Sequence, residues 1–177
     1  MELNRIAELA RQDAGRKFHS IAHLLTVESL RAAFASLRKD AAAGVDGVTY
    51  AEYEEHLVGN LVHLHDRVKS KTYRAQPLRR IYIDKDDGRK RPISIPSLED
   101  KIVQRATVDL LNAIFEQDFL DCSYGFRPGR SAHDAIRKLH EILPSGSANY
   151  ILDADIVSFF DSIDRRMLMK MLGGRIA

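Results

Sequence analysis

The chain has 177 residues and a formal net charge of +2, with 45% hydrophobic and 29% charged residues. This composition is typical of an ordinary soluble protein and excludes a strongly basic binder. No apolar run approaches the roughly 20 residues that span a bilayer, and no signal peptide is recognisable, so we expect no membrane association. The single cysteine, Cys122, without a Cys/His cluster, excludes a disulfide framework and a structural zinc site and favours a cytoplasmic location.

The first part of the chain is predicted to be helical throughout residues 3–38. Apolar residues recur at helical spacing through residues 3–38, with a cap at Thr26, and we interpret this stretch as an N-terminal extension. Residues 44–47 (GVDG) place two glycines around an aspartate, which indicates either a plain tight turn or a loop whose backbone approaches a partner closely. Thr49 and Glu52 then form a capping box that opens a long helix.

Residues 79–95 are predicted to form a β-hairpin. Residues 79–84 alternate as a strand, residues 86–88 (DDG) form a turn, and residues 90–95 return as an edge strand containing Pro92. The hairpin is rich in cations, namely Arg79, Arg80, Lys85, Arg89, Lys90 and Arg91. These side chains are either a solvated hairpin tip or a clamp for phosphate groups.

Two capped helices flank a loop of aromatic residues and arginines. Ser97 and Asp100 cap the first helix, and Ser131 begins the second. Between them, residues 123–130 (SYGFRPGR) combine stacking rings with guanidinium groups, a pattern that suits single-stranded nucleic acid. The alternative is a structural loop in which an arginine packs on Phe126.

A buried strand is predicted over residues 149–157, where an apolar, β-branched run carries two carboxylates. Asp153 and Asp155 share one face, and Asp155 lies nearer the strand's exit, where its oxygens suit Mg²⁺. Phe160 follows at the turn and provides an aromatic floor beside the metal. A structural aspartate that begins a turn is the alternative, and a short helix is predicted over 165–172.

Taken in this order, the motifs closely resemble those of group II intron-encoded reverse transcriptases, from about Lys17 onward. The motifs that carry the resemblance are Gly44-Val45-Asp46-Gly47, Arg89-Lys90-Arg91-Pro92 with Ile95-Pro96, Leu98-Glu99-Asp100-Lys101-Ile102-Val103-Gln104, Ser123-Tyr124-Gly125-Phe126-Arg127-Pro128-Gly129-Arg130-Ser131, and Asp155-Ile156 with Phe159-Phe160-Asp161. The resemblance does not separate intron maturases from CRISPR-associated or diversity-generating relatives.

The resemblance implies roles for individual residues. Asp155 matches the family's first catalytic aspartate, and the carbonyl of Ile156 helps to hold the second of two Mg²⁺ ions. Phe160 matches the gate that stacks under the sugar and rejects a 2′-hydroxyl. Lys85 and Arg91 match the cations that grip the incoming deoxynucleoside triphosphate.

Further residues are expected to contact an RNA template paired with a DNA primer, or intron RNA. The resemblance places the backbone of the GVDG loop over the template–primer and Arg127, with Arg130, near the template. The hairpin cations Arg79, Arg80, Arg89 and Lys90 complete the expected nucleic-acid surface.

The expected fold is α+β, a right-hand polymerase represented by its fingers and the first palm strand. Its expected parts are a helical extension over 1–40, fingers over 41–146 and the beginning of the palm over 147–177. The family's second acidic motif, Tyr-x-Asp-Asp, does not occur in the chain, so we expect the chain alone not to polymerise. The unpartnered strand edge is expected to favour self-association. The alternative function is a non-catalytic, maturase-like RNA-binding module.

Overall fold

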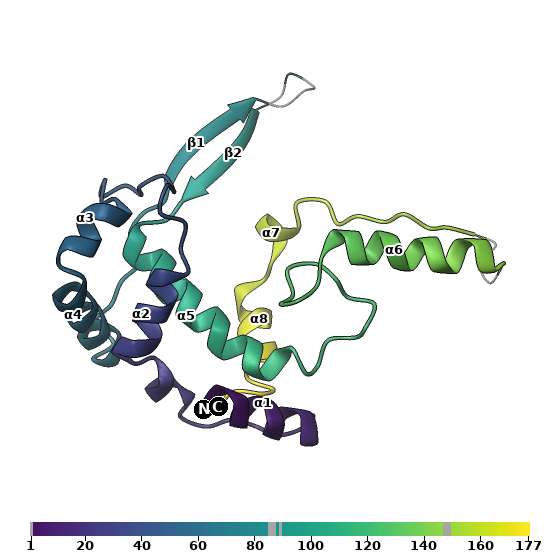
Figure 1. Ribbon diagram of the computed structural model, residues 1–177, viewed down its shortest axis with the longest axis horizontal. Helices are drawn as coiled ribbons and strands as arrows, with labels where there is room; N and C mark the ends of the chain where they lie inside the picture. The colour runs from purple at the N-terminus through teal and green to yellow at the C-terminus, as the bar shows by residue number, and fades with distance from the viewer. Residues whose placement is uncertain (1, 85–87, 89, 147–149) are drawn as a thin grey trace. The chain divides into compact units, whose positions relative to one another are not determined.

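The computed structural model describes residues 2–84, 88, 90–146 and 150–177 (Figure 1). Among these residues the fold is helix-rich, with one two-stranded antiparallel sheet, which agrees with the expected α+β class. None of the helices in this part of the chain is long and apolar enough to cross a membrane. In chain order, the elements are α1 (Glu2–Gln12), η1 (Ile21–Leu24), α2 (Val27–Ala35), α3 (Tyr50–Glu55), α4 (Leu57–Lys69), β1 (Arg79–Asp84), β2 (Lys90–Ile95), α5 (Leu98–Phe115), α6 (Ala132–Ile142), η2 (Leu143–Ser145), α7 (Phe159–Ser162) and α8 (Arg165–Leu172).

The chain forms two compact units. The central unit comprises residues 20–111, and the terminal unit comprises residues 1–19 together with 112–177. Helix α5 begins in the central unit, and its last turn belongs to the terminal unit. The boundaries expected for extension, fingers and palm describe a different kind of division and stay predictions.

The core of the central unit forms where α2, α3, α4 and α5 bring their apolar faces together. The ring of Phe34 stacks on that of Tyr50 with centroids 4.1 Å apart. The ring centroid of Tyr53 lies 5.8 Å from that of Phe34. The fully buried aliphatic side chains around these rings are Leu30, Leu61, Leu64 and Ile102. Each such side chain contributes about 1.5–3 kcal/mol through its removal from water, so this cluster holds the four helices together.

The expectation of a helix throughout residues 3–38 is wrong. Helix α1 ends at Gln12, and α2 starts only at Val27. The carboxylate of Asp13 accepts a hydrogen bond from the N–H of Gly15 at 2.8 Å, which is a local turn that competes with helix continuation. The cap is confirmed, since the hydroxyl of Thr26 accepts a hydrogen bond from the N–H of Ser29 at 3.2 Å.

The long helix predicted after the capping box is divided in two. The box itself is confirmed: the hydroxyl of Thr49 accepts from the N–H of Glu52, whose carboxylate accepts from the N–H of Thr49 at 2.9 Å. The division falls at His56, whose backbone (φ −122°, ψ 31°) lies outside the helical region and separates α3 from α4. The apolar stripe continues across this break, so Tyr53 and Leu61 are both buried.

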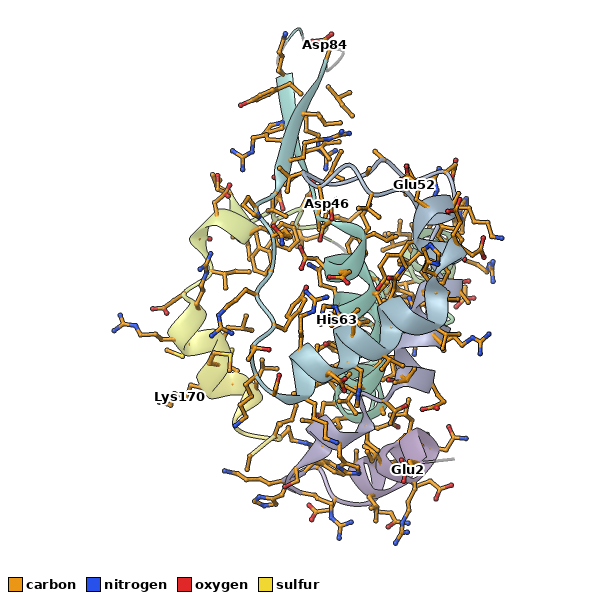
Figure 2. All side chains as sticks on the ribbon, turned by 90° about the vertical axis from the view of Figure 1, so that its left-hand side faces the viewer. Glu2, Asp46, Glu52, His63, Asp84 and Lys170 are labelled. Carbon is orange, nitrogen blue, oxygen red and sulfur yellow. The ribbon has the colours of Figure 1, made fainter. Side chains whose placement is uncertain are left out.

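The hairpin formed by β1 and β2 is confirmed, with Arg79 paired to Ile95 at the base and Asp84 paired to Lys90 toward the tip. Figure 2 shows Asp84 at the far end of this hairpin and Asp46 near its base. Of the predicted turn over 86–88 only Gly88 is described, and Lys85 and Arg89 lie outside the described residues. Most of the hairpin is exposed, and burial begins only toward Ile95.

A buried arginine organises the terminal unit. The guanidinium of Arg175 lies 3.0 Å from the carboxylate of Asp118 and donates to the carbonyl of Ala14. Beside it, Phe18 and Ile176 form an isolated parallel bridge. These contacts join the segment that follows α1 to the segment that follows α8, whose predicted bounds are confirmed.

The prediction of a buried strand over 149–157 is wrong, because residues 150–156 have no regular secondary structure. Every residue from Tyr150 to Val157 is exposed, including Leu152 at 91%. The reason is that a strand is stabilised by hydrogen bonds to a neighbouring strand. The described residues place no strand beside this segment. Its self-association stays a prediction.

Gly44 marks the closest backbone approach in the central unit. A Cβ atom added to this buried residue would lie 2.5 Å from Cα and 2.6 Å from the nitrogen of Ser97. Such distances do not occur in real structures, so the GVDG loop fits against the start of α5 only because residue 44 has no side chain. The glycine signal found in the sequence therefore has a packing cause at this position.

We predict that Gly44→Ala destabilises the central unit by about 1–3 kcal/mol, the usual effect of forcing atoms into a packed site. Gly59→Ala is the matched control, since nothing lies within 4 Å of its added Cβ and the residue lies within α4. Alanine should stabilise that helix by up to about 1 kcal/mol. Urea unfolding followed by circular dichroism measures both changes, and equal effects would contradict the proposed packing.

Candidate nucleotide and nucleic-acid binding surfaces

The predicted catalytic aspartate lies in the terminal unit with its carboxylate exposed. Among the described residues, no hydrogen bond or ion pair involves the side chains of Asp153, Asp155 or Asp161. Asp164 differs, since its carboxylate caps α8 by accepting from the N–H groups of Arg166 and Met167 at 2.8 and 3.2 Å. The alternative interpretation of Asp155 as a turn-capping residue therefore finds no contact in the described structure.

The aromatic pair follows directly after this segment. Ser158 adopts a left-handed backbone conformation (φ 49°) at the start of the short helix α7. Phe159 and Phe160 meet edge to face with their ring centroids 5.2 Å apart. The ring of Phe160 is 82% exposed, so one large apolar surface is available beside the aspartates.

The donor atoms near Asp155 suit a hard cation but do not form a complete site. Carboxylate and carbonyl oxygens are the ligands that Mg²⁺ takes, and it commonly completes its octahedron with water and substrate phosphates. The carboxylate of Asp155 and the carbonyl of Ile156 are of this kind. Among the described residues, no group of three or more potential ligand side chains lies together.

The two strands of the hairpin divide its side chains between two faces. Directly paired residues point to the same side of a sheet. Arg91 is paired with Ile83, so it lies on the face that carries Ile81 and Ile93. Lys90 lies on the opposite face. Arg91 is exposed and makes no ion pair within the described chain, which leaves its guanidinium available for a phosphate.

Asp155 and the hairpin belong to different compact units. Their convergence on one triphosphate, which the resemblance implies, therefore stays a prediction.

The base of the hairpin is fastened by a buried carboxylate. Asp100, only 3% exposed, accepts hydrogen bonds from the hydroxyl of Ser97 at 2.8 Å, the N–H of Gln76 at 3.0 Å and the hydroxyl of Tyr73. Gln76 precedes β1 and Ser97 follows β2, so one side chain joins both ends of the hairpin. The pKa of Tyr73 is raised mainly by burial and further by the hydrogen bond to Asp100, so its phenol stays protonated and can donate.

A second polar contact lies next to this one on α5. Glu99 accepts from the guanidinium of Arg67 at 2.5 Å and from the phenol of Tyr53 at 3.4 Å. From the sequence, Asp100 was expected to cap α5, and no contact was predicted for Tyr73, Arg67 or Glu99. No periodic or spacing signal marks these residues, because their partners are more than 20 positions away in the chain.

The GVDG loop lies in the central unit against the base of the hairpin. Gly44 is buried, whereas Val45, Asp46 and Gly47 are exposed. The ammonium group of Lys101 holds the preceding segment by donating to the carbonyl of Ala42 at 2.7 Å, and burial lowers the pKa of this lysine. Both earlier interpretations thus hold in part: Gly47 (φ +72°) forms a turn, and Gly44 permits close approach.

A cavity of about 620 Å³ lies beside the GVDG loop, and its acidic members are Asp46, Glu52 and Glu99. Carboxylates repel phosphate groups. We therefore expect any contact of this loop with phosphate groups to lie away from these carboxylates; Val45, which does not line the cavity, is 52% exposed.

The loop over 123–130 uses its first arginine internally. Arg127 is 9% exposed and donates to Glu116 at 2.7 Å and to the carbonyls of Leu120 and Ser123 at 2.7 and 2.9 Å. Its guanidinium lies 5.2 Å from the ring centroid of Phe119. These contacts favour the structural alternative for Arg127 and correct its partner, since it packs on Phe119 instead of Phe126.

Arg130 is also engaged. It donates to the carbonyl and the carboxylate of Asp121 at 2.7 and 2.9 Å, and it lies over the ring of Tyr124 at 5.4 Å. The aromatic side chain of Phe126 is fully exposed, at 107%, and its backbone is left-handed (φ 56°). The expected nucleic-acid contact by Arg127 is therefore disfavoured, since its buried guanidinium already donates four hydrogen bonds within the chain, and that by Arg130 would compete with Asp121.

We predict that Asp100→Ala lowers the unfolding free energy by about 3 kcal/mol, because the buried hydroxyl of Ser97 and the partly buried donors of Tyr73 and Gln76 lose their acceptor. Asp109→Ala is the control on the same helix: its exposed pair with Arg105 should contribute less than about 0.5 kcal/mol. Chemical denaturation measures both variants. A loss at Asp100 no larger than that at Asp109 would show that the hairpin base does not depend on this carboxylate.

We also predict that Arg127→Ala destabilises the terminal unit by about 3 kcal/mol, since it leaves Glu116 partly buried and unpaired. The control, Arg137→Ala, removes an exposed cation 3.4 Å from Asp134 and should change stability by less than about 0.5 kcal/mol. RNA affinity of the folded Arg127 variant should match that of the wild-type chain. Weaker RNA binding without loss of stability would restore the nucleic-acid role.

Comparison with known proteins identifies the family. Residues 83–173 match the model of the family "Reverse transcriptase (RNA-dependent DNA polymerase)". The chain is similar to Protein YkfC of Escherichia coli (strain K12), with 41% identity over 137 residues, covering 76% of this chain and 36% of that protein. It is also similar to the Group II intron-encoded protein LtrA of Lactococcus lactis subsp. cremoris, with 31% identity over 179 residues, covering 98% of this chain and 29% of that protein.

A further relative is the Uncharacterized 91 kDa protein in cob intron of Schizosaccharomyces pombe (strain 972 / ATCC 24843), 40% identical over 109 residues, 62% of this chain and 13% of that protein. The chain thus spans about a third of the length of YkfC and of LtrA. Because the family model matches more than half of its residues and its relatives include group II intron-encoded proteins, the chain belongs to the reverse transcriptase family and, within it, to the group II intron-encoded type.

Proposed function

We propose that this chain provides the fingers and the first catalytic aspartate of an RNA-directed DNA polymerase. The observation that carries the proposal is the side chain of Asp155, which is exposed and makes no hydrogen bond or ion pair with the described residues, whereas the nearby Asp164 caps a helix. A carboxylate that stabilises nothing within its own chain is available for an external ligand. Membership of the reverse transcriptase family makes a metal-bound nucleotide the best-supported ligand.

The proposed division of work follows the donor types. Asp155 and the carbonyl of Ile156 would hold Mg²⁺, which when bound neutralises charge on the transferring phosphate. Arg91 would bind the phosphates through its guanidinium fork. Phe160 would pack against the sugar and exclude a 2′-hydroxyl. Lys85 is proposed for the same phosphate role, although it lies outside the described residues.

The substrates proposed are an RNA template with a DNA primer and deoxynucleoside triphosphates. Phosphoryl transfer requires alignment and charge neutralisation more than covalent help from the protein. The residues above provide one carboxylate source, and the chain contains no Tyr-x-Asp-Asp sequence. We therefore propose that catalysis requires a second acidic cluster and that the chain alone does not extend a primer.

The first test joins the chain to the palm and thumb of a group II intron-encoded relative and compares Asp155→Ala with Asp161→Ala. Loss of Asp155 should reduce primer extension by at least about 100-fold, the scale expected for removing one preorganised electrostatic group. Asp161 is an exposed carboxylate close in sequence and should have a much smaller effect. Both variants should retain RNA affinity, and unchanged synthesis by the Asp155 variant would exclude it from the mechanism.

The second test separates the two faces of the hairpin. In the same joined polymerase, Arg91→Ala should raise the KM for the incoming nucleotide about tenfold or more, since a charge-assisted hydrogen bond contributes roughly 1.5–3 kcal/mol. Lys90→Ala, on the opposite face, should leave this KM nearly unchanged. A fall in template affinity with a constant nucleotide KM would show that Arg91 binds the template instead.

A non-catalytic RNA-binding module is the second candidate. It is favoured by the exposed hairpin cations Arg79, Arg80, Lys90 and Arg91, which form no ion pair within the described chain. RNA binding through these cations should weaken as salt rises, because phosphate contacts release counterions. Salt-dependent RNA binding, together with primer extension by the joined polymerase that does not change in Asp155→Ala, would support this candidate over the polymerase.

A further inference from the structure

The outer surface of the hairpin carries an aromatic side chain that the proposed function does not use. The register pairs Arg80 with Ser94, Tyr82 with Pro92, and Asp84 with Lys90. Because paired residues share a face, these side chains form one surface, here called the Tyr82 face. The isoleucines and Arg91 lie on the other face. The hairpin thus presents two chemically different surfaces.

Tyr82 is placed to meet a ligand. Its side chain is 62% exposed, and no hydrogen bond or ring contact involves it within the described chain. Its partner across the strands is Pro92, a compact neighbour with no N–H and no long side chain to cover the ring. An aromatic residue exposed on a sheet face provides a flat platform of the kind on which bases stack.

Cations lie before and after this ring along the hairpin. Arg80 is two residues from Tyr82 on the same strand, a separation of about 7 Å, and Lys90 is the diagonal neighbour on the other strand at a similar separation. Arg80 makes one long hydrogen bond, 3.4 Å to the hydroxyl of Ser94, and no ion pair with a described residue. Asp84 faces Lys90 across the strands, so Arg80 is the stronger of the two phosphate contacts.

We propose that the Tyr82 face binds a single-stranded segment of nucleic acid, with one base stacked on Tyr82 and adjacent phosphates on Arg80 and Lys90. A duplex is excluded as the main ligand because its bases are already stacked and paired, which leaves no free ring surface for the tyrosine. The inference rests on the proposed function, in which the segment is the unpaired part of the RNA template, and it adds a second ligand surface to the hairpin.

The competing explanation is that Tyr82 only stabilises the hairpin by packing across the strands on Pro92. Two substitutions distinguish the explanations. Tyr82→Phe keeps both the packing and the aromatic face, whereas Tyr82→Leu keeps an apolar side chain for packing but removes the ring. Circular dichroism and thermal unfolding of each variant establish whether the fold is retained.

The test measures binding of fluorescently labelled oligouridine, and of an RNA duplex of equal length, to the intact chain. Tyr82→Leu should weaken oligouridine binding about 5- to 150-fold, the range for loss of one stacked base, and should leave duplex binding nearly unchanged. Tyr82→Phe should bind like the wild-type chain. Ile83→Leu, on the other face, is the matched control and should also bind like the wild-type chain.

Salt dependence tests the phosphate contacts. Arg80→Ala should lower the slope of log affinity against log salt by about one unit for oligouridine, the effect expected for one lost phosphate contact. Wild-type affinity in Tyr82→Leu, equal losses for single-stranded and duplex RNA, or absence of oligouridine binding by the intact chain would each overturn the proposal. If Asp155→Ala abolishes synthesis while Tyr82→Leu binds normally, only this inference fails. If synthesis is independent of Asp155, the polymerase assignment fails separately.

Discussion

The buried carboxylate of Asp100 is the interaction on which the exposed half of the central unit depends. A two-stranded hairpin is marginally stable by itself in water, and β1 and β2 bury almost nothing along most of their length. Asp100 accepts hydrogen bonds from residues that precede β1 and follow β2, so it closes the hairpin at its base. Gly44 brings the GVDG loop against the same point, where a side chain would collide with Ser97. Motifs that are separate in the sequence thus meet at one junction.

This junction explains why the motifs of the central unit could be recognised in the sequence although their arrangement in space could not be predicted. The capping boxes, the hairpin and the last helix were predictable because each depends on neighbours within a few positions, as Thr49 and Glu52 show. The hydrogen bond from Tyr73 to Asp100 was not predictable, since it joins residues 27 positions apart and leaves no periodic trace. The break at His56 and the turn at Asp13 were missed for a related reason, because the apolar spacing continues on both sides of each.

In the loop over 123–130, composition suggested contacts between arginines and nucleic acid, whereas the arginines contact residues of this chain. Rings and guanidinium groups in one loop suggested a nucleic-acid surface, yet Arg127 is buried against Glu116 and Phe119, and Arg130 is held by Asp121. A guanidinium has five donors in a fixed fork, which suits internal carbonyls as well as phosphates. Composition alone does not distinguish these uses. On the hairpin the situation is reversed, because the cations make no ion pair within the described chain and remain available.

The segment around Asp155 was predicted as a buried strand, and yet the described structure forms the hairpin and leaves this segment irregular. The difference lies in partners. Strand β1 has β2 beside it and a closed base, whereas nothing described pairs with residues 150–156. A metal ligand on an unpaired segment is not held in a fixed geometry, and Mg²⁺ requires near-octahedral placement of its oxygens. Adding a neighbouring strand would order the segment and orient Asp155 in one step. If Asp155 binds Mg²⁺ as proposed, strand pairing and metal affinity would therefore be coupled, as folding and metal binding are elsewhere.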